Sequence, residues 1–274
     1  MATLTTDTLE VPHGRLYYEV RGSGPVLLMI PGGPMDAGGF APLADCLADR
    51  YTVVTYDCRG NSRSRHDGPG DELTVELFAD DAARLLQAVS SEASFVLGSS
   101  GGATYGLDLV ARHPGTVQTL IAHEPPVASI LPDADQWRAF NESIRTTYER
   151  EGVFPAMQRF GEGVGLGGPP PESDMTPEAM DAMSRMMGNM ELFAGHLIPV
   201  IGNYTPDLDA LRASSTHIVV GVGETSTPQQ LPYRTAHALA AELGVLTAPF
   251  PGDHGGFGAH PEDFAKRVHE ELTV

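Results

Sequence analysis

Short runs of apolar residues alternate along the chain with longer segments in which apolar residues recur at helical spacing. The runs predict strands covered on both faces, at residues 26–30, 52–56, 95–97, 117–122, 218–222 and 245–248. The longer segments predict helices at residues 40–50, 73–89, 103–113, 229–243 and 261–272. Alternating apolar residues at 9–20 predict an antiparallel hairpin before the first buried strand. This order predicts an α/β fold, a mostly parallel twisted sheet with helices on both faces.

The interval 125–215 interrupts the alternation of strands and helices. It is helix-like and contains a Gly/Pro-rich loop at 161–173. We therefore expect one catalytic core, formed by residues 1–124 and 216–274, with residues 125–215 inserted as a helical cap.

Apolar side chains of this expected cap favour a role in substrate binding. Methionines recur at helical spacing, and several aromatic residues accompany them. We expect Trp137, Met183 and Met187 to line an apolar pocket under the cap. The alternative is that these side chains form only the core of the cap itself.

Acidic residues outnumber basic residues by 36 to 17, which gives a formal net charge of -19. Nucleic acids and anionic membranes require clustered Lys and Arg, so we expect neither as a partner. No apolar stretch approaches the roughly 18 residues that span a bilayer. The first nine residues are polar, without the apolar core of a signal peptide. We expect a soluble, cytoplasmic protein and leave its oligomeric state open, a homo-oligomer included.

The chain contains two cysteines, Cys46 in a predicted helix and Cys58 just after a predicted strand. Neither belongs to a CxxC pair or a His-rich stretch, so we expect no disulfide and no metal site. Cys58 lies in the charged loop 57–64, to which we assign a structural role because such charges commonly hold loops together.

A serine lies at the corner between the strand at 95–97 and the helix at 103–113. Gly98, Ser100 and Gly102 match the pattern G-x-S-x-G, in which the glycines let the backbone turn tightly and leave the serine hydroxyl exposed. Ser100 is therefore the candidate nucleophile. The alternative, a glycine-rich turn without a catalytic role, does not explain why the match falls between a strand and a helix.

A serine hydroxyl needs a nearby base, an acid that orients the base, and donors for the oxyanion formed on attack. In open parallel sheets, ligands bind outside the carboxyl ends of the strands. Among the ten histidines, His254 has the best placement, in a loop between the last predicted strand and the last helix. We expect His254 to be the base and Phe257, in the same loop, to contact substrate.

The donors for the oxyanion are expected from two glycine-containing turns. One is the Gly101 N–H, directly after the candidate nucleophile. The other comes from the loop that follows the first buried strand, where Gly33 is preferred and Gly32 is the alternative. Pro34 and Met35 continue this loop, and we expect both to contact substrate.

The order of these features resembles the α/β-hydrolase family over nearly the whole chain. Three shorter stretches, Ser99-Ser100-Gly101, His123-Glu124-Pro125-Pro126 and Ser62-Arg63-Ser64, look similar to stretches of the zearalenone lactonases, which open a resorcylic macrolactone by hydrolysis. The chain departs from the general family at Pro31, where many members have histidine. It departs again at Ser226, where the acid usually follows the seventh strand.

The serine at the usual acid position cannot carry a charge, so another carboxylate must serve. Four candidates lie at suitable places along the chain: Glu224, Asp253, Asp209 and Glu124. Glu124 follows the strand after the nucleophile strand, and the two prolines behind it would stiffen its loop. The resemblance to zearalenone lactonases, which use a glutamate in a similar His-Glu-x-Pro stretch, also favours Glu124.

These features predict a serine hydrolase that needs no cofactor and cleaves a carboxylic ester or lactone of an apolar or aromatic small molecule. The same fold also supports carbon-carbon hydrolysis, thioester hydrolysis and cofactor-free oxygenation. A slow-turnover ligand receptor that retains the triad is a further alternative.

Overall fold

One sheet forms the centre of the molecule. The computed structural model describes residues 3–68, 72–166 and 177–273. In this part of the chain nine strands join in the order β1-β2-β4-β3-β6-β7-β8-β9, with β5 beside β2. Their bounds are β1 (Thr5–Val11), β2 (Gly14–Arg21), β3 (Val26–Ile30), β4 (Thr52–Tyr56), β5 (Arg65–His66), β6 (Ser94–Ser99), β7 (Val117–His123), β8 (His217–Gly223) and β9 (Thr247–Phe250). β1, β2 and β5 pair antiparallel, whereas the path from β4 to β9 is parallel.

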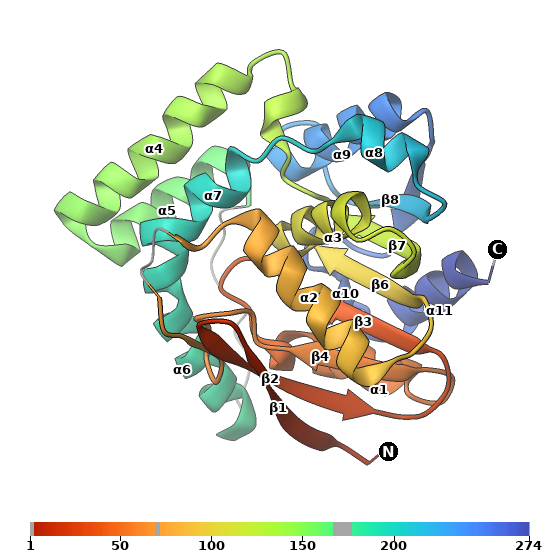
Figure 1. Cartoon of the computed structure of the whole chain (residues 1–274). Coiled ribbons are helices and arrows are strands. Elements are labelled where there is room, and N and C mark those ends of the chain that lie inside the picture. Colours follow the sequence, from red (N-terminus) through yellow and green to blue (C-terminus); the bar gives the residue numbers. More distant parts are fainter. Residues whose placement is uncertain (1–2, 69–71, 167–176, 274) are drawn as a thin grey trace.

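Helices cover both faces of this sheet, as Figure 1 shows. One face packs against α2 (Val75–Val89), α3 (Gly101–Arg112) and α9 (Leu231–Leu243), and the other against α1 (Ala41–Leu47) and α11 (Pro261–Leu272). Successive side chains of a strand point to opposite faces. In β3, Leu28 and Ile30 accordingly join the first group of helices, and Leu27 and Met29 join the second. The predicted fold class is confirmed.

The last strand begins later than the sequence predicted. The apolar run at 245–248 was expected to form it, but Leu246 is 92% exposed. Gly244, at φ 71°, ends α9, and the Val245 N–H donates to the Ala240 carbonyl across this turn. That hydrogen bond is typical of a Schellman motif, so Val245 belongs to the end of the helix.

The helices between β7 and β8 follow the short 3-10 helix η3 (Ala128–Ile130). They are α4 (Ala134–Glu151), α5 (Val153–Val164), α6 (Pro177–Leu192), the π-helical turn η4 (Phe193–Leu197), α7 (Ile198–Gly202) and α8 (Leu208–Ala213). In Figure 1, α4, α5, α6 and α7 lie to one side of the sheet, whereas α8 packs beside α3 and α9. We call the segment from α4 to α7 the inserted helices.

Two details of this segment differ from the sequence expectation. α5 continues to Val164, so a helix occupies the beginning of the loop expected at 161–173. The residues of that loop from 167 onward lie outside the described residues. The second detail is that α8, at the end of the interval 125–215, packs beside α3 and α9, with Leu211 buried.

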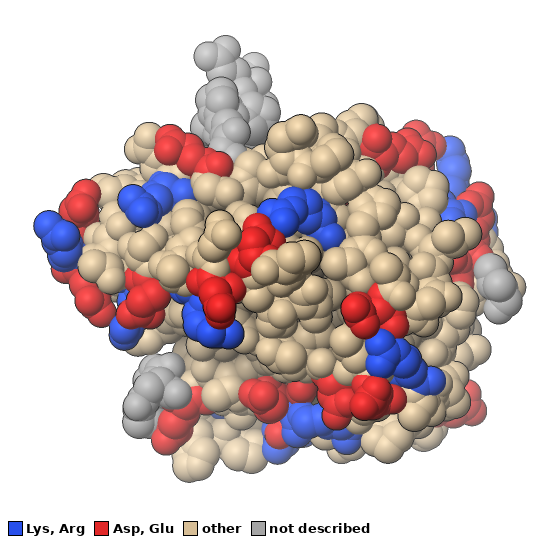
Figure 2. All heavy atoms as spheres, turned by 90° about the horizontal axis from the view of Figure 1, so that it is seen from above, with Lys and Arg blue, Asp and Glu red and all other residues tan. Residues whose placement is uncertain are grey.

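Charges of both signs are mixed on the surface. On the face drawn in Figure 2, basic side chains stand beside acidic ones. Surface ion pairs such as Arg212 with Glu242 at 3.1 Å contribute to this pattern. None of the helices within the described residues is long and apolar enough to cross a membrane.

Candidate active site

Ser100 occupies the sharp turn between β6 and α3. Its backbone lies at φ 55° and ψ -123°, a region that costs a non-glycine residue about 1–3 kcal/mol. The Ser100 N–H donates to the His123 carbonyl at 2.9 Å, which fixes the turn against β7. The flanking glycines have no room for a side chain, since a Cβ would lie 2.6 Å from the Ala103 Cα at Gly98 and 2.0 Å from the Ile30 oxygen at Gly102. The G-x-S-x-G pattern therefore has a steric basis here.

The loop after β9 carries His254, and the end of β7 carries Glu124. His254 Nδ1 lies 2.6 Å from Glu124 Oε2, and the Gly223 N–H donates to Glu124 Oε1 at 3.0 Å. Glu124 is itself strained, at φ 49°, and its N–H donates to the Gly221 carbonyl. Both carboxylate oxygens thus have partners in a buried position. If Nδ1 donates its proton to the carboxylate, Nε2 remains free to accept one.

The environment of Glu124 favours its charged form. Burial by itself raises the pKa, but the hydrogen bond to His254 and the charges of His254 and His123 lower it more, to about 2. Ser226, at the usual acid position of the family, is buried nearby and its hydroxyl also lowers this pKa.

The three other carboxylates that the sequence offered form no hydrogen bond with His254 in the described part of the chain. Glu224 is exposed. Asp253 is also exposed, and its Oδ1 accepts from the Gly255 N–H at 2.9 Å. Asp209 pairs with Arg212 on the surface of α8. Of the four candidates, the geometry therefore favours Glu124.

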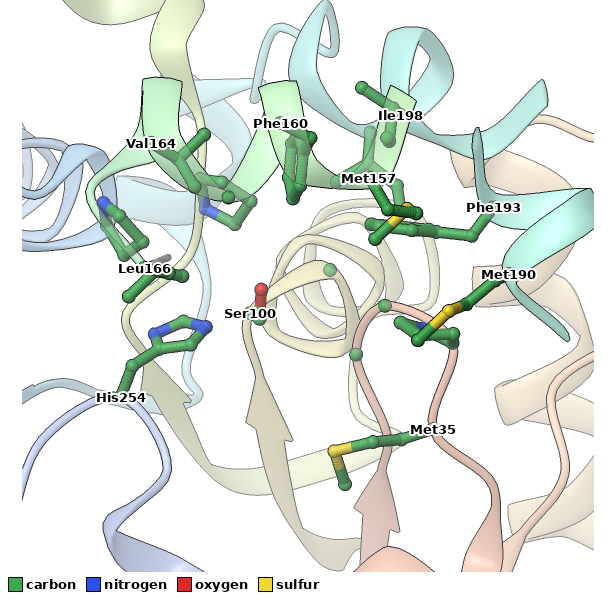
Figure 3. A pocket seen from close by; sticks show the side chains of 18 of the residues that line it. Met35, Ser100, Met157, Phe160, Val164, Leu166, Met190, Phe193, Ile198 and His254 are labelled. Carbon is green, nitrogen blue, oxygen red and sulfur yellow. The ribbon is translucent and has the colours of Figure 1, made fainter. Parts of the chain in front are cut away.

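Ser100 and His254 line a single cavity of about 1210 Å³ between the sheet and the inserted helices. In Figure 3 the imidazole stands beside the serine hydroxyl, and the side chains of the inserted helices lie above both. Because Nδ1 faces Glu124, the other ring nitrogen is the one available to the serine. Ser100 and the free ring nitrogen of His254 therefore share one cavity.

The two glycine-containing turns meet at Ser100. A Cβ on Gly32 would lie 2.7 Å from the Ser100 Cβ, so the loop after β3 lies directly against the serine. Gly33 has φ +54° and also lines the cavity. Gly101 is the first residue of α3, where a backbone N–H has no partner within the helix. Gly32 and Gly101 are thus beside the candidate nucleophile, and Gly33 lines the same cavity.

His123 lies behind the site, and sequence reasoning gave it no role. Its ring is fully buried, with its centroid 6.3 Å from that of His254, and it packs edge-on against Phe250 and Phe264 at 5.7 and 5.4 Å. Burial lowers the pKa of His123 to about 4. The ring is therefore neutral at neutral pH and places no second positive charge behind His254.

Four of the six expected substrate contacts line the cavity: Pro34, Met35, Met187 and Phe257. The other two, Trp137 and Met183, are not among the described residues that line it. Trp137 packs edge-on against Phe140 and donates its indole N–H to Asp133, within a small core between α4, α5 and α9. Met183 lies one helical turn before Met187 and does not line the cavity.

Other apolar side chains of the inserted helices complete the wall. Met157, Phe160 and Val164 line it from α5, at the i, i+3 and i+7 spacing of a single helix face. This amphipathic spacing is a signal that the sequence offered. Phe193 contributes from the π-helical turn, for which the sequence gave no signal.

The charged loop after β4 has the structural contacts expected of it. The Asp57 carboxylate accepts from the Ala37 and Arg63 backbone N–H groups and from the Arg63 side chain. Arg59 is fully buried and forms a two-point ion pair with Asp81. Within the described residues, no group of three His, Cys, Asp or Glu side chains could hold a metal ion.

Known proteins with similar sequences and folds are hydrolases. A family model described as alpha/beta hydrolase fold matches residues 25–184. The uncharacterised hydrolase YraK of Bacillus subtilis is 37% identical over 275 residues, which cover 98% of this chain and 97% of the relative. Zearalenone hydrolase of Bionectria ochroleuca is 26% identical over 280 residues, 97% of each chain. A crystallised hydrolase from Pseudomonas aeruginosa shares the fold with a TM-score of 0.77 at 21% identity, over 98% of each chain.

Proposed function

The chain belongs to the alpha/beta hydrolase fold family, and from that premise we propose that it is a serine hydrolase of carboxylic esters or lactones. Membership of this family and the similarity to hydrolases indicate that the chain is a hydrolase. The identity of the catalytic residues and of the bond that is cleaved is what we propose. The observation that carries it is the 2.6 Å contact between the buried Glu124 and His254, which lines the same cavity as Ser100.

In the proposed mechanism, Ser100 Oγ bonds to the substrate carbonyl carbon while its proton passes to His254 Nε2. Glu124 stabilises the resulting imidazolium, and the N–H groups of Gly101 and Gly33, or of the neighbouring Gly32, stabilise the oxyanion. His254 then gives the proton to the leaving alkoxide as the carbon–oxygen ester bond breaks. A water molecule then loses a proton to His254 and bonds to the acyl carbon, and the bond from that carbon to Ser100 Oγ breaks as His254 returns the proton to Oγ.

The cavity supports a neutral, apolar substrate. Methionine, phenylalanine and branched aliphatic side chains form much of its wall, and Lys and Arg are absent among the described residues that line it. A substrate carrying several negative charges would lose its hydration without gaining a cationic partner. Zearalenone hydrolase, whose name identifies a macrocyclic lactone as its substrate, matches this chain along nearly its full length, which favours lactones among the candidates.

We also propose that residues 125–215 act as a cap over the core, formed by 1–124 and 216–274. α5, α6 and α7 all contribute side chains to the cavity wall, so they bound the substrate on the side opposite the sheet. A substrate bound beneath these helices would exclude water from the acyl-enzyme, apart from the water molecule that attacks the acyl carbon.

The proposal is tested with purified protein on p-nitrophenyl esters, simple lactones and macrolactones, together with a fluorophosphonate probe. We expect steady turnover and labelling of Ser100, both lost in Ser100→Ala. Retained labelling in Ser100→Ala would contradict the nucleophile assignment. One equivalent of product followed by a stall would favour a slow-turnover receptor. Hydrolysis of thioesters or carbon-carbon bonds in preference to esters would favour the other chemistries of this fold.

A further inference from the structure

Asn189 lies in the last turn of α6 and is 4% exposed, although most of its neighbours on that helix are apolar. Its side chain crosses from the inserted helices to the core. Nδ2 donates to the Pro34 carbonyl at 2.9 Å and contacts Ser62 Oγ at 2.9 Å, while Oδ1 accepts from the Ser62 N–H at 2.7 Å. A buried amide with its donor and acceptor both satisfied by one partner surface holds a defined orientation.

A second contact joins the same helix to the same loop one turn earlier. Arg185 pairs with the Asp36 carboxylate, which also accepts from Ser62 Oγ at 3.1 Å and from the Gly38 N–H at 2.9 Å. Arg185 and Asn189 are four residues apart, so they lie on one face of α6. The two side chains differ in their partners, since only Asn189 binds a backbone atom of the segment that touches Ser100.

The position of Pro34 gives this hydrogen bond a consequence for the reaction. Pro34 directly follows Gly33, which has φ +54°, lines the cavity with Ser100 and adjoins Gly32 beside the serine, so Gly33 is a candidate oxyanion donor. The proline ring restricts the backbone between Gly33 and the anchored carbonyl. A bond to that carbonyl therefore restricts the direction of the peptide groups around Gly33.

We propose that Asn189 is a positioning residue for the oxyanion loop, and that the inserted helices complete the oxyanion site through it. This inference rests on the proposed function, because it assumes that Gly33 and its neighbours stabilise an oxyanion. Asn189 does not need to contact the substrate. Its effect is expected in the transition state and not in substrate binding.

Two variants separate the possible roles of Asn189. Asn189→Leu removes all of its hydrogen bonds. Asn189→Asp retains an acceptor for the Ser62 N–H but replaces the donor to the Pro34 carbonyl with a carboxylate oxygen. Arg185→Met is the matched control, because it removes the other contact between α6 and the loop without touching the Pro34 carbonyl.

The measurements are kcat and KM on the best ester, the rate of fluorophosphonate labelling, the inhibition constant of a trifluoromethyl ketone, and the midpoint of thermal unfolding. We expect Asn189→Leu and Asn189→Asp to lower kcat and the labelling rate about 10- to 100-fold and to weaken the ketone by a similar factor, with KM changed less than about 3-fold. Arg185→Met should stay within about 3-fold of the wild type in every kinetic measure.

Several outcomes would overturn the inference. If Asn189→Asp matches the wild type, the bond to Pro34 has no role in the reaction. If Arg185→Met loses as much kcat as Asn189→Leu, any attachment of α6 suffices and no donor is being positioned. If the Asn189 variants lose only thermal stability, the residue is structural. A wild-type protein that neither turns over esters nor reacts with the fluorophosphonate would instead refute the proposed function, and the inference with it.

Discussion

Glu124 Oε1 accepts a hydrogen bond from the backbone N–H of Gly223, 99 positions further along the chain, at 3.0 Å. The carboxylate therefore extends from the end of β7 to the end of β8, the strand after which the family usually carries its acid. Ser226 stands at that usual position, and its hydroxyl lies near enough to lower the pKa of Glu124. Neighbouring parallel strands end at the same edge of the sheet. A glutamate that follows β7 can therefore reach the position after β8 where the family usually has its acid and this chain has Ser226.

Glu124→Gln is expected to lower kcat by about 10³- to 10⁴-fold while leaving KM and the fold largely unchanged, because the imidazolium loses its anionic partner and the amide can favour the wrong tautomer. Steady-state kinetics and circular dichroism check this expectation. Glu224→Gln is the matched control, since Glu224 is exposed, and it should stay within about 3-fold of the wild type. Reversed effects of the two variants would mean that Glu224 is the acid.

The low pKa of Glu124 predicts a specific acid sensitivity of the fold. A carboxyl whose pKa is about 2 in the folded chain, against an ordinary 4.5, binds protons more readily when unfolded. Its contribution to stability is therefore complete above about pH 4.5 and is lost as the pH falls toward 2. The difference corresponds to a few kcal/mol, on the order of 3, at 1.36 kcal/mol per pKa unit.

Urea unfolding between pH 6 and pH 2.5 measures this contribution. The wild type should lose more free energy of unfolding over that interval than Glu124→Gln, which has no proton to take up at this position. Equal pH dependence in the two proteins would contradict the low pKa. The Glu224→Gln variant supplies the comparison for removing one exposed carboxylate.

Arg59→Met is expected to destabilise the fold by about 3–5 kcal/mol, because it leaves the buried carboxylate of Asp81 without its two-point partner. Chemical denaturation at pH 7 checks this value. Burial already raises the pKa of Asp81, against the lowering effect of Arg59, so the variant should regain stability as the pH falls and Asp81 takes up a proton.

A double variant separates the buried charge from simple loss of packing. Arg59→Met with Asp81→Leu should be more stable than Arg59→Met alone, since no unpaired charge remains in the core. If the double variant is no more stable than the single one, the stability is lost because the carbonyls of Pro12 and His13 no longer accept hydrogen bonds from Arg59.

The parts of the site that the sequence predicted are those fixed by local backbone geometry. Ser100 was predicted because a strand, a tight turn and a helix leave a pattern of glycines in five consecutive residues, and His254 because it lies in the last loop at the carboxyl edge. The prediction of Glu124 also required the inference that the strand before it ends at the same edge of the sheet as the strands that carry Ser100 and precede His254. In the structure Glu124 contacts His254, and Ser100 lines the same cavity as His254; the roles of the three residues stay a prediction.

The residues that sequence reasoning missed or misplaced depend on packing between distant segments. Trp137 and Met183 are residue types common in pocket walls, but the direction of each side chain depends on how α4 and α6 pack against the neighbouring elements. Asn189 binds a carbonyl 155 residues earlier in the chain. A single amide in a methionine-rich helix gives no periodic signal of such a contact.

The cavity wall offers a direct test of whether the methionines of α6 select the substrate. Met187 lines the cavity, whereas Met183, on the same helix one turn earlier, does not. Met187→Ala should enlarge the pocket and change the ratio of kcat/KM between a short-chain and a long-chain ester by about 5- to 30-fold, within the roughly 1–3 kcal/mol that a hydrophobic pocket distinguishes per methylene group. Met183→Ala should leave this ratio unchanged. Thermal unfolding of both variants separates a change of pocket shape from a general loosening of the helix. If both variants shift the ratio equally, α6 influences the substrate through its position and not through the side chain at 187. If neither variant shifts it, these two methionines do not select the substrate.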